Sequence, residues 1–79
     1  MSELKQTLVD IVKALVDKPD EVSVIEIEES KDTVTLELTV DPDDTGKVIG
    51  RHGRIAKAIR TVMKAAAINS GKRVNVEIK

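Results

Sequence analysis

The sequence predicts one α+β domain, built from a three-stranded mixed sheet with three helices on one face. Two observations lead to this prediction. Apolar residues follow a helical period in some segments and alternate with polar residues in others, in the order α-β-β-α-α-β. The chain has only 79 residues, which suits a single domain over residues 1–79. Because two helices separate the second strand from the third, these strands should be parallel neighbours, whereas the first strand should pair antiparallel with the second.

The first helix is predicted over residues 3–17. Ser2 is a suitable N-cap, and Pro19 ends the helix soon after its last turn. The apolar residues that recur there at helical spacing are Leu4, Leu8, Ile11, Val12 and Leu15. This spacing predicts an amphipathic helix with one face toward the core.

Two strands follow and should form a hairpin with one buried face. Residues 22–29 predict the first strand, with Ile25 and Ile27 on one side and glutamates on the other. Residues 33–40 predict the second strand, because apolar residues alternate strictly with threonine and glutamate. The apolar positions of this strand are Val34, Leu36, Leu38 and Val40. The far face of the sheet is expected to be polar and exposed.

The second half of the chain begins with a segment that ends the sheet, Asp41-Pro42-Asp43-Asp44, and that offers N-caps for a short helix over residues 45–49. Gly50 ends this helix, and a longer helix follows Gly53 and runs to about residue 69. Its expected apolar face contains Ile55, Ile59, Val62, Met63 and Ala66. Another face is basic and contains Arg54, Lys57, Arg60 (or Thr61) and Lys64. After a turn at Ser70-Gly71, a last strand alternates Val74, Val76 and Ile78 with polar residues.

Charged residues are strongly segregated along the chain. Residues 1–44 carry 13 acidic and four basic side chains, whereas residues 45–79 carry one acidic and nine basic side chains. The basic half predicts a surface that binds a polyanion, and the acidic half predicts a solubilising face that repels nucleic acid. The chain contains no Phe, Tyr or Trp. This absence excludes modules that read bases by stacking them on aromatic rings.

Other classes of function are disfavoured. His52 is the only histidine and has no evident partner as a general base, and no nucleophile is evident. The chain also has no cysteine, so we expect no enzyme activity, no catalytic residues, no metal and no cofactor. No apolar run approaches the roughly 20 residues of a membrane span, and the N-terminus does not resemble a signal peptide. We therefore expect a cytoplasmic protein without membrane contact.

The most informative segment is the loop between the last two helices, Val48-Ile49-Gly50-Arg51-His52-Gly53-Arg54-Ile55. Gly50 can adopt a positive φ where the first of these helices ends. Gly53 has no side chain where the next helix starts, so a sugar–phosphate backbone can approach the N–H groups and the positive dipole end of that helix. The residues expected to contact nucleic acid are Lys47, Val48, Ile49, Gly50, Arg51, His52, Gly53, Arg54, Ile55 and Lys57. The glycine pair alone would also fit a plain turn between two helices.

The wider pattern over residues 46–55, set between a strand and a long helix, resembles the signature of the KH domain with its GXXG loop. The strand order resembles the type II arrangement, and the whole chain resembles the small single-KH RNA-binding proteins of bacteria, the KhpA type. Three short segments strengthen this resemblance: Lys18-Pro19-Asp20, Asp44-Thr45-Gly46 and Arg60-Thr61. His52 departs from it, because Lys, Asp or Gly is common at that position, and the charge there becomes dependent on pH.

The resemblance implies sequence-tolerant binding of single-stranded RNA, with about four nucleotides in a groove between the helices that flank the loop and the neighbouring sheet edge. It implies a post-transcriptional regulator or RNA chaperone that acts as a homodimer or with a larger KH-containing RNA-binding protein. Three alternatives stay open: a protein-interaction (dimerisation) module with the KH fold, a single-stranded DNA binder, and a helix-turn-helix that inserts residues 54–69 into a DNA major groove. Aspartates at Gly50 and Gly53, or at Arg51 and His52, are expected to abolish RNA binding and leave the fold intact, because the loop should pack against little.

Overall fold

The computed structural model describes residues 3–79, so the predicted N-cap, Ser2, lies outside the described residues. The helices and strands follow the predicted order. They are α1 (Glu3–Lys13), β1 (Ser23–Glu28), β2 (Thr33–Thr39), α2 (Thr45–Ile49), α3 (Arg54–Asn69) and β3 (Arg73–Ile78). Three short 3₁₀ turns precede β1, α2 and α3, and they span Pro19–Glu21, Pro42–Asp44 and Arg51–Gly53. The bounds of α2 and α3 are those predicted from the sequence.

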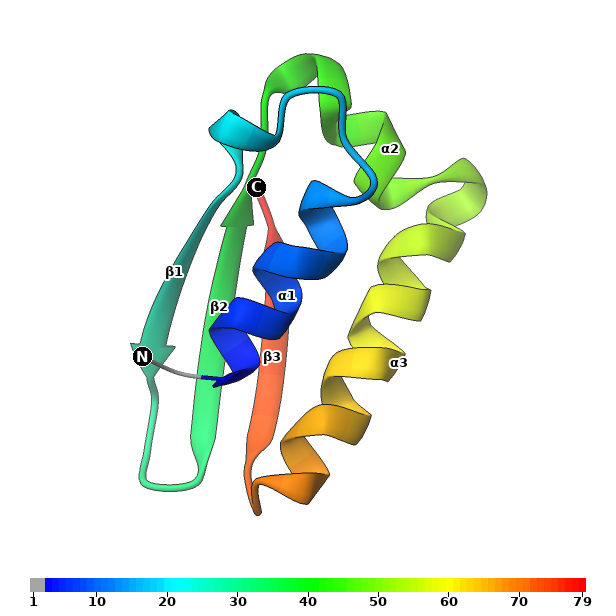
Figure 1. Cartoon of the computed structure of the whole chain (residues 1–79). Coiled ribbons are helices and arrows are strands. Elements are labelled where there is room, and N and C mark those ends of the chain that lie inside the picture. The colour runs from blue at the N-terminus through cyan, green and yellow to red at the C-terminus, as the bar shows by residue number, and fades with distance from the viewer. Residues whose placement is uncertain (1–2) are drawn as a thin grey trace.

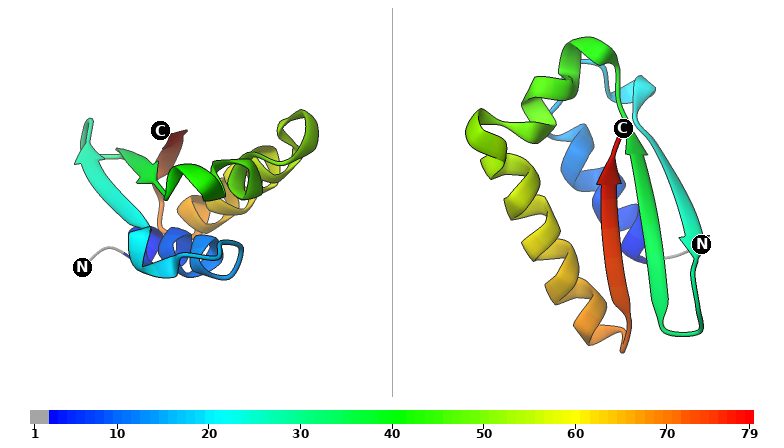
Figure 2. Two further views of the ribbon diagram at one scale, coloured as in Figure 1. Left: turned by 90° about the horizontal axis from the view of Figure 1, so that it is seen from above. Right: turned by 180° about the vertical axis from the view of Figure 1, so that it is seen from behind.

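The strands form one sheet in the order β1-β2-β3 (Figure 1). β1 is antiparallel to β2 and β3 is parallel to it, which confirms the predicted pairing. Leu36 lies near the middle of the sheet, opposite Glu26 of β1 and Val76 of β3. α1 and α3 lie on one side of the sheet, as the end-on view of Figure 2 shows, and α2 packs against the start of α3 beyond the end of β2. No described helix covers the other face.

The core lies between the sheet and the helices. Its fully buried apolar side chains are Leu8, Val12, Leu36, Leu38, Val48 and Met63. Burying each such side chain stabilises the fold by about 1.5–3 kcal/mol relative to leaving it exposed. Val48 is the contribution of α2, so core packing also holds the helix that leads into the candidate site.

The first helix is shorter than predicted, because α1 ends at Lys13 and not at residue 17. The backbone N–H groups of Asp17 and Lys18 donate to the carboxylate of Asp44, at 3.3 and 3.0 Å, and not to helix carbonyls. Asp44 lies 26 positions beyond Lys18 in the chain. The local spacing of apolar residues therefore contains no sign of the contact that holds residues 17 and 18 outside the helix.

The side chains of β1 that face the helices are those of the valine and the glutamates, and not those of the isoleucines. Val24 is buried, whereas Ile25 and Ile27 are 55% and 38% exposed. The expectation of a wholly polar uncovered face is therefore wrong at these two positions. The register explains the difference: Val24 lies opposite Leu38, which enters the core, and directly opposite residues share one face of a sheet.

The buried stripe of α3 is shifted slightly from the predicted one. Ile59 and Met63 are buried as expected, but Val62 is 50% exposed. Ala56 and Ala67 are buried in addition. The stripe thus follows the three- and four-residue spacing of one helix face, and Val62 lies beside it.

Candidate nucleic-acid interface

The connection between α2 and α3 turns through two glycines and two exposed residues. Gly50 has a φ of 74° and a ψ of 174°, and Gly53 has a φ of 73° and a ψ of 15°. His52 also adopts a left-handed conformation, with a φ of 58°. The N–H of Gly50 donates to the carbonyl of Gly46 at 2.9 Å, and the N–H of Gly53 donates to the carbonyl of Gly50 at 3.1 Å. Backbone hydrogen bonds therefore shape the loop, and the side chains of Arg51 and His52 at its tip stay exposed.

The two glycines are required for different reasons. A Cβ atom at Gly50 would lie 2.6 Å from Cγ1 of Ile55, so packing as well as the positive φ demands glycine there. A Cβ atom at Gly53 would meet no atom within 4 Å, so the backbone at Gly53 is open to a ligand. The expectation that aspartates at Gly50 and Gly53 leave the fold intact is therefore wrong for Gly50, because any side chain there collides with Ile55.

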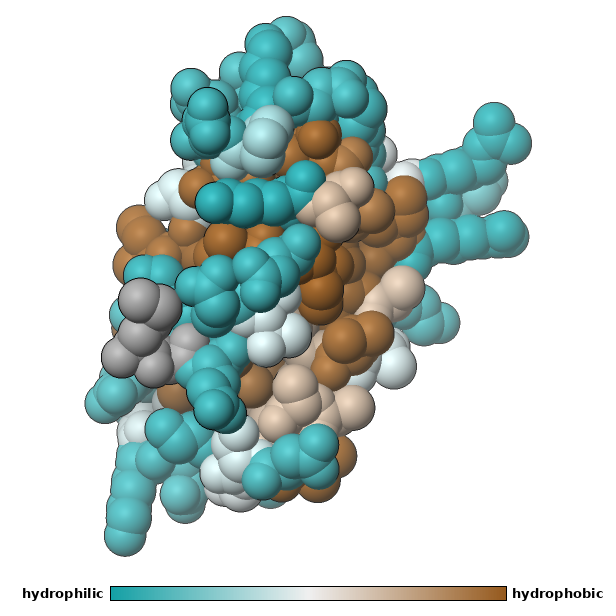
Figure 3. All heavy atoms as spheres, viewed as in Figure 1, coloured by the Kyte–Doolittle hydropathy of each residue, from teal (hydrophilic) through white to brown (hydrophobic). Residues whose placement is uncertain are grey.

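The start of α3 combines free cationic side chains with the positive end of the helix dipole. Arg51, His52, Arg54 and Lys57 are exposed, and their ionisable groups form no hydrogen bond or ion pair with another described residue. Gly53 caps α3 without any side-chain hydrogen bond, and the first turn contains no acidic residue. The N–H of Arg54 donates to the carbonyl of Arg51, so at this residue the helix offers an anion its positive dipole end and not a free N–H. Figure 3 shows long hydrophilic side chains projecting at this end of the molecule.

Two predicted contact residues have other roles in the structure. Nζ of Lys47 lies 2.9 Å from Oδ2 of Asp17 and 3.5 Å from Oδ1 of Asp44. The hydrogen bond and charge of Asp17 raise the pKa of Lys47, so its charge is balanced by carboxylates and adds little to the field at the loop. Val48 is fully buried. The expectation that bases lie on Val48 is therefore wrong, because its side chain fills the core.

The Asp44 carboxylate ties α2 to the segment that follows α1. It is buried and accepts the backbone N–H groups of Asp17 and Lys18. It forms no side-chain cap on α2, whereas Asp41 caps the preceding 3₁₀ turn by accepting the N–H of Asp43 at 2.9 Å. Burial raises the pKa of Asp44, but the two N–H donors and Lys47 outweigh burial, and the pKa lies below the usual 3.8. The ionised carboxylate therefore positions α2 and, through it, the loop.

Replacing Asp44 by asparagine is expected to flatten the acid limb of the stability profile. Because the folded pKa lies below 3.8, the ionised group stabilises the fold above that pH, and the contribution is lost as the pH falls through the folded pKa. The unaltered chain should thus lose Tm between about pH 5 and pH 2 more steeply than Asp44→Asn. Thermal melts by circular dichroism measure this, with Asp43→Asn as the control, because the Asp43 carboxylate is exposed. Equal slopes for the unaltered chain and Asp44→Asn would contradict the assignment.

A groove runs between α3 and the edge of β3. Two hollows, of about 290 and about 170 Å³, share Lys64, Val74 and Asn75 in their walls. Nε of Arg60 donates to the carbonyl of Val76 at 3.3 Å and so lies along this wall. Helical spacing placed Arg60 and Lys64 on a basic face, but it contained no sign that the edge of β3 lies opposite them. Asn75 was missed, although strand alternation assigns it to a polar position.

The other side of α3 forms an apolar groove with α1. A hollow of about 390 Å³ there is lined mainly by Ile11, Leu15, Ile55, Ala58 and Val62. Figure 3 shows hydrophobic atoms in a band between these two helices. Ile55 is half-buried in this groove, whereas Ile49 is exposed beside the loop. Of the aliphatic residues predicted to contact bases, Ile55 therefore faces the apolar groove and Ile49 faces solvent.

Two further features concern metal ions and membranes. Among residues 3–79, no group of three or more His, Asp or Glu side chains could hold a metal ion. The helices of the same residues are too short or too polar to cross a membrane.

Sequence comparisons place the chain close to a set of bacterial proteins. The family model described as KhpA/KhpB, KH domain, matches residues 5–78. The RNA-binding protein KhpA of Clostridium acetobutylicum is 60% identical, over 95% of this chain and 99% of its own length. The RNA-binding proteins KhpA of Aquifex aeolicus and Bacillus subtilis are 53% and 51% identical, over 99% and 95% of this chain and over 98% and 91% of their own lengths. These relatives are named as RNA-binding proteins and not as enzymes.

Solved structures of Era contain a region of similar fold. Era of Aquifex aeolicus bound to GDP.AlF4- superposes with a TM-score of 0.68 and 17% identity, over 95% of this chain and 29% of that chain. Era in complex with MgGDPNP and nucleotides 1506–1542 of 16S ribosomal RNA superposes with a TM-score of 0.65 and 17% identity, over 95% of this chain and 28% of that chain. At this level of identity the likeness concerns the fold alone.

Proposed function

The chain belongs to the KhpA/KhpB family of KH domains, and on that basis we propose that it binds single-stranded RNA with little sequence preference. The family match over residues 5–78 supports treating the 79 residues as one KH domain. The proposed site holds the RNA backbone at residues 50–53. The proposed role is that of a post-transcriptional regulator or RNA chaperone in the cytoplasm, where bacterial RNA is made and translated.

One observation carries this proposal: the open backbone at Gly53 adjoins the positive dipole end of α3 and three cationic side chains without partners among the described residues, Arg51, Arg54 and Lys57. A phosphate group that approaches Gly53 would meet the positive end of the helix dipole. The neighbouring guanidinium groups would add charge-assisted hydrogen bonds. None of these contacts depends on the identity of a base, so the site would tolerate many sequences.

The bases would follow the backbone into the groove between α3 and β3. Arg60, Lys64 and Asn75 offer hydrogen bonds there, and Val74 offers aliphatic surface. Because the chain has no aromatic residue, the bases cannot gain the roughly 1–3 kcal/mol each that stacking on a ring provides. Binding should therefore be weak, with a Kd in the micromolar range.

Binding should also depend steeply on salt. Each phosphate contact of a single strand contributes a slope of about −0.7 to the plot of log K against log salt, and we expect about two to four contacts. Filter binding of a single-stranded RNA of about eight nucleotides, at about 50 and about 200 mM salt, measures the slope. Single-stranded and duplex DNA of the same sequence serve as competitors. A flat salt response, or a preference for duplex DNA, would contradict the proposal.

We propose in addition that the protein acts as more than one copy or with a larger KH-containing RNA-binding protein. A single site of about four nucleotides holds RNA briefly, and joining two such sites raises the effective affinity by about 10²–10⁴ when both can engage. The apolar groove between α1 and α3 supports a protein contact, because it adjoins the loop through Arg54 and exposes Leu15 and Val62.

Sedimentation at several protein concentrations, with and without RNA, tests this association. We expect the average mass to rise with concentration, and to rise further when the RNA offers two sites. A strict monomer at tens of micromolar that binds RNA tightly and one to one would contradict association. The loop variants separate the two functions. If these variants still associate, and if they bind RNA as well as the unaltered chain does, the alternative of a pure protein-interaction module is favoured.

A further inference from the structure

The outer edge of β1 is unpaired. β1 pairs only with β2, and no described element lies beside its other edge (Figures 1 and 2). The N–H of Glu29 donates to the carbonyl of Thr33 at 3.0 Å, and this bond sets the alternation of the β1–β2 ladder. Counted back along the antiparallel strand, Val24, Glu26 and Glu28 turn their backbone N–H and C=O groups to the free edge. These three residues, at alternate positions along β1, therefore offer backbone hydrogen bonds to another strand.

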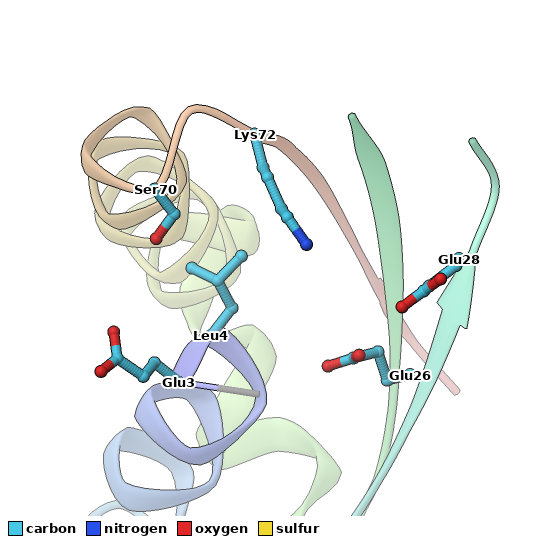
Figure 4. A pocket seen from close by; sticks show the side chains of 6 residues that line it. All are labelled: Glu3, Leu4, Glu26, Glu28, Ser70 and Lys72. Atoms are coloured by element: carbon cyan, nitrogen blue, oxygen red, sulfur yellow. The ribbon is translucent and has the colours of Figure 1, made fainter. Parts of the chain in front are cut away.

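The side chains of β1 have one chemistry on each face of the sheet. Ile25 and Ile27 are exposed on the uncovered face, and Glu26 and Glu28 lie on the helix side. Figure 4 shows the two carboxylates pointing into a hollow of about 360 Å³, into which Lys72 also extends from the turn before β3. Oε1 of Glu26 is buried and has no hydrogen-bond partner. Among the described residues, Lys72 forms no ion pair with either glutamate.

We propose that this edge binds an extended segment of a partner protein in which Lys or Arg alternates with aliphatic residues. Such a segment would add a fourth strand to the sheet, through the free backbone groups of β1. Its basic side chains would lie on the helix side beside Glu26 and Glu28, and its aliphatic side chains would cover Ile25 and Ile27. Cross-strand neighbours of opposite charge stabilise a sheet, and a basic group in the hollow would give Glu26 its missing partner.

Other occupants fit this edge less well. A second copy that paired through its own β1 would bring glutamates of both copies to one side of the sheet, where like charges repel. The helix side of β3 carries Val74, Val76 and Ile78 and offers no positive charge. RNA would be repelled by the carboxylates and has no strand backbone to pair. β1 and the loop over residues 50–53 lie at opposite sides of Figure 1, so partner and RNA could bind together.

The test is an NMR titration of the full ¹⁵N-labelled chain with the peptide acetyl-Lys-Val-Lys-Val-Lys-Val-Lys-amide. We expect the amide signals of Val24, Glu26 and Glu28 to shift and their exchange with solvent to slow. Exchange at Ile25 and Ile27, whose N–H groups already bond to β2, should change little. In the added strand the lysines pair with these three residues, so their N–H groups face β1 while those of the valines face away. N-methylation of the lysines should abolish binding, and N-methylation of the valines should preserve it.

A matched pair of variants tests the charge requirement. Glu28→Lys should weaken peptide binding about three- to fivefold, because one cross-strand attraction becomes a repulsion. Asp20→Lys makes the same change in charge at an exposed site outside the strand and should leave binding within about twofold. The proposal is overturned by lack of binding at millimolar peptide, by shifts centred away from β1, by equal binding of the two methylated peptides, or by equal effects of the two variants.

Discussion

Replacing Arg51 and His52 together by aspartate is expected to weaken binding of single-stranded RNA by about 100-fold or more and to change the free energy of unfolding by less than about 1 kcal/mol. The Arg51 guanidinium would lose hydrogen bonds to phosphate worth about 1.5–3 kcal/mol each, and two new carboxylates would repel the RNA backbone. Both side chains are exposed and have no partner among the described residues, so the fold loses no contact. The φ of 58° at residue 52 is one that aspartate tolerates better than most residues.

The control for this variant carries the same change in charge elsewhere. Ser30→Asp with Lys31→Asp lies in the exposed turn between β1 and β2. Filter binding measures the RNA affinity of both variants, and urea melts followed by circular dichroism measure their stability. If the control weakens RNA binding as much as the loop variant does, the long-range field and not the loop governs binding, and the assignment of residues 50–53 is wrong.

Gly50→Ala is expected to destabilise the fold by about 3 kcal/mol or more, the largest effect of any single substitution in the loop. Two costs add at this position. The combination of φ 74° and ψ 174° is essentially confined to glycine, and a Cβ atom would lie 2.6 Å from Cγ1 of Ile55. A chain of 79 residues has a net stability of only about 3–5 kcal/mol. The variant should therefore be partly or wholly unfolded at room temperature.

Two other glycines of the same region are matched controls. Gly46→Ala lies within α2, where a Cβ atom meets nothing within 4 Å, and should be neutral or stabilising by about 0.5–1 kcal/mol. Gly53→Ala has equally open space but a φ of 73°, and should cost about 1–2 kcal/mol. Gly53→Ala should stay folded and still bind RNA more weakly, because its methyl group obstructs the approach of the backbone. Urea melts that gave the same loss for Gly50→Ala and Gly53→Ala would contradict the contact with Ile55.

Local periodicity and turn chemistry were sufficient for the elements and their order. The alternation in β2 and β3, the glycines that flank the loop and the helical spacing after residue 54 are each contained in a short window of sequence. The parallel pairing of β2 and β3 followed as well, because two intervening helices leave few other connections. The segregation of charge and the glycine pair also predicted where the free cationic side chains lie, since Arg51, Arg54 and Lys57 are exposed without partners among the described residues.

By itself, then, the sequence determined the α+β architecture, the position of the loop and its positive charge, because each depends on neighbours in the chain. Tertiary structure alone decided which residues of the chain remain exposed and free to bind a ligand. Asp44 binds the N–H groups of Asp17 and Lys18, and Asp17 draws Lys47 into an ion pair, through contacts between residues more than 25 positions apart. Val48 turns into the core, Gly50 packs against Ile55, and β1 exposes its isoleucines because its register follows β2. These outcomes depend on which face of each element meets which neighbour, and that choice is made only when the whole core packs.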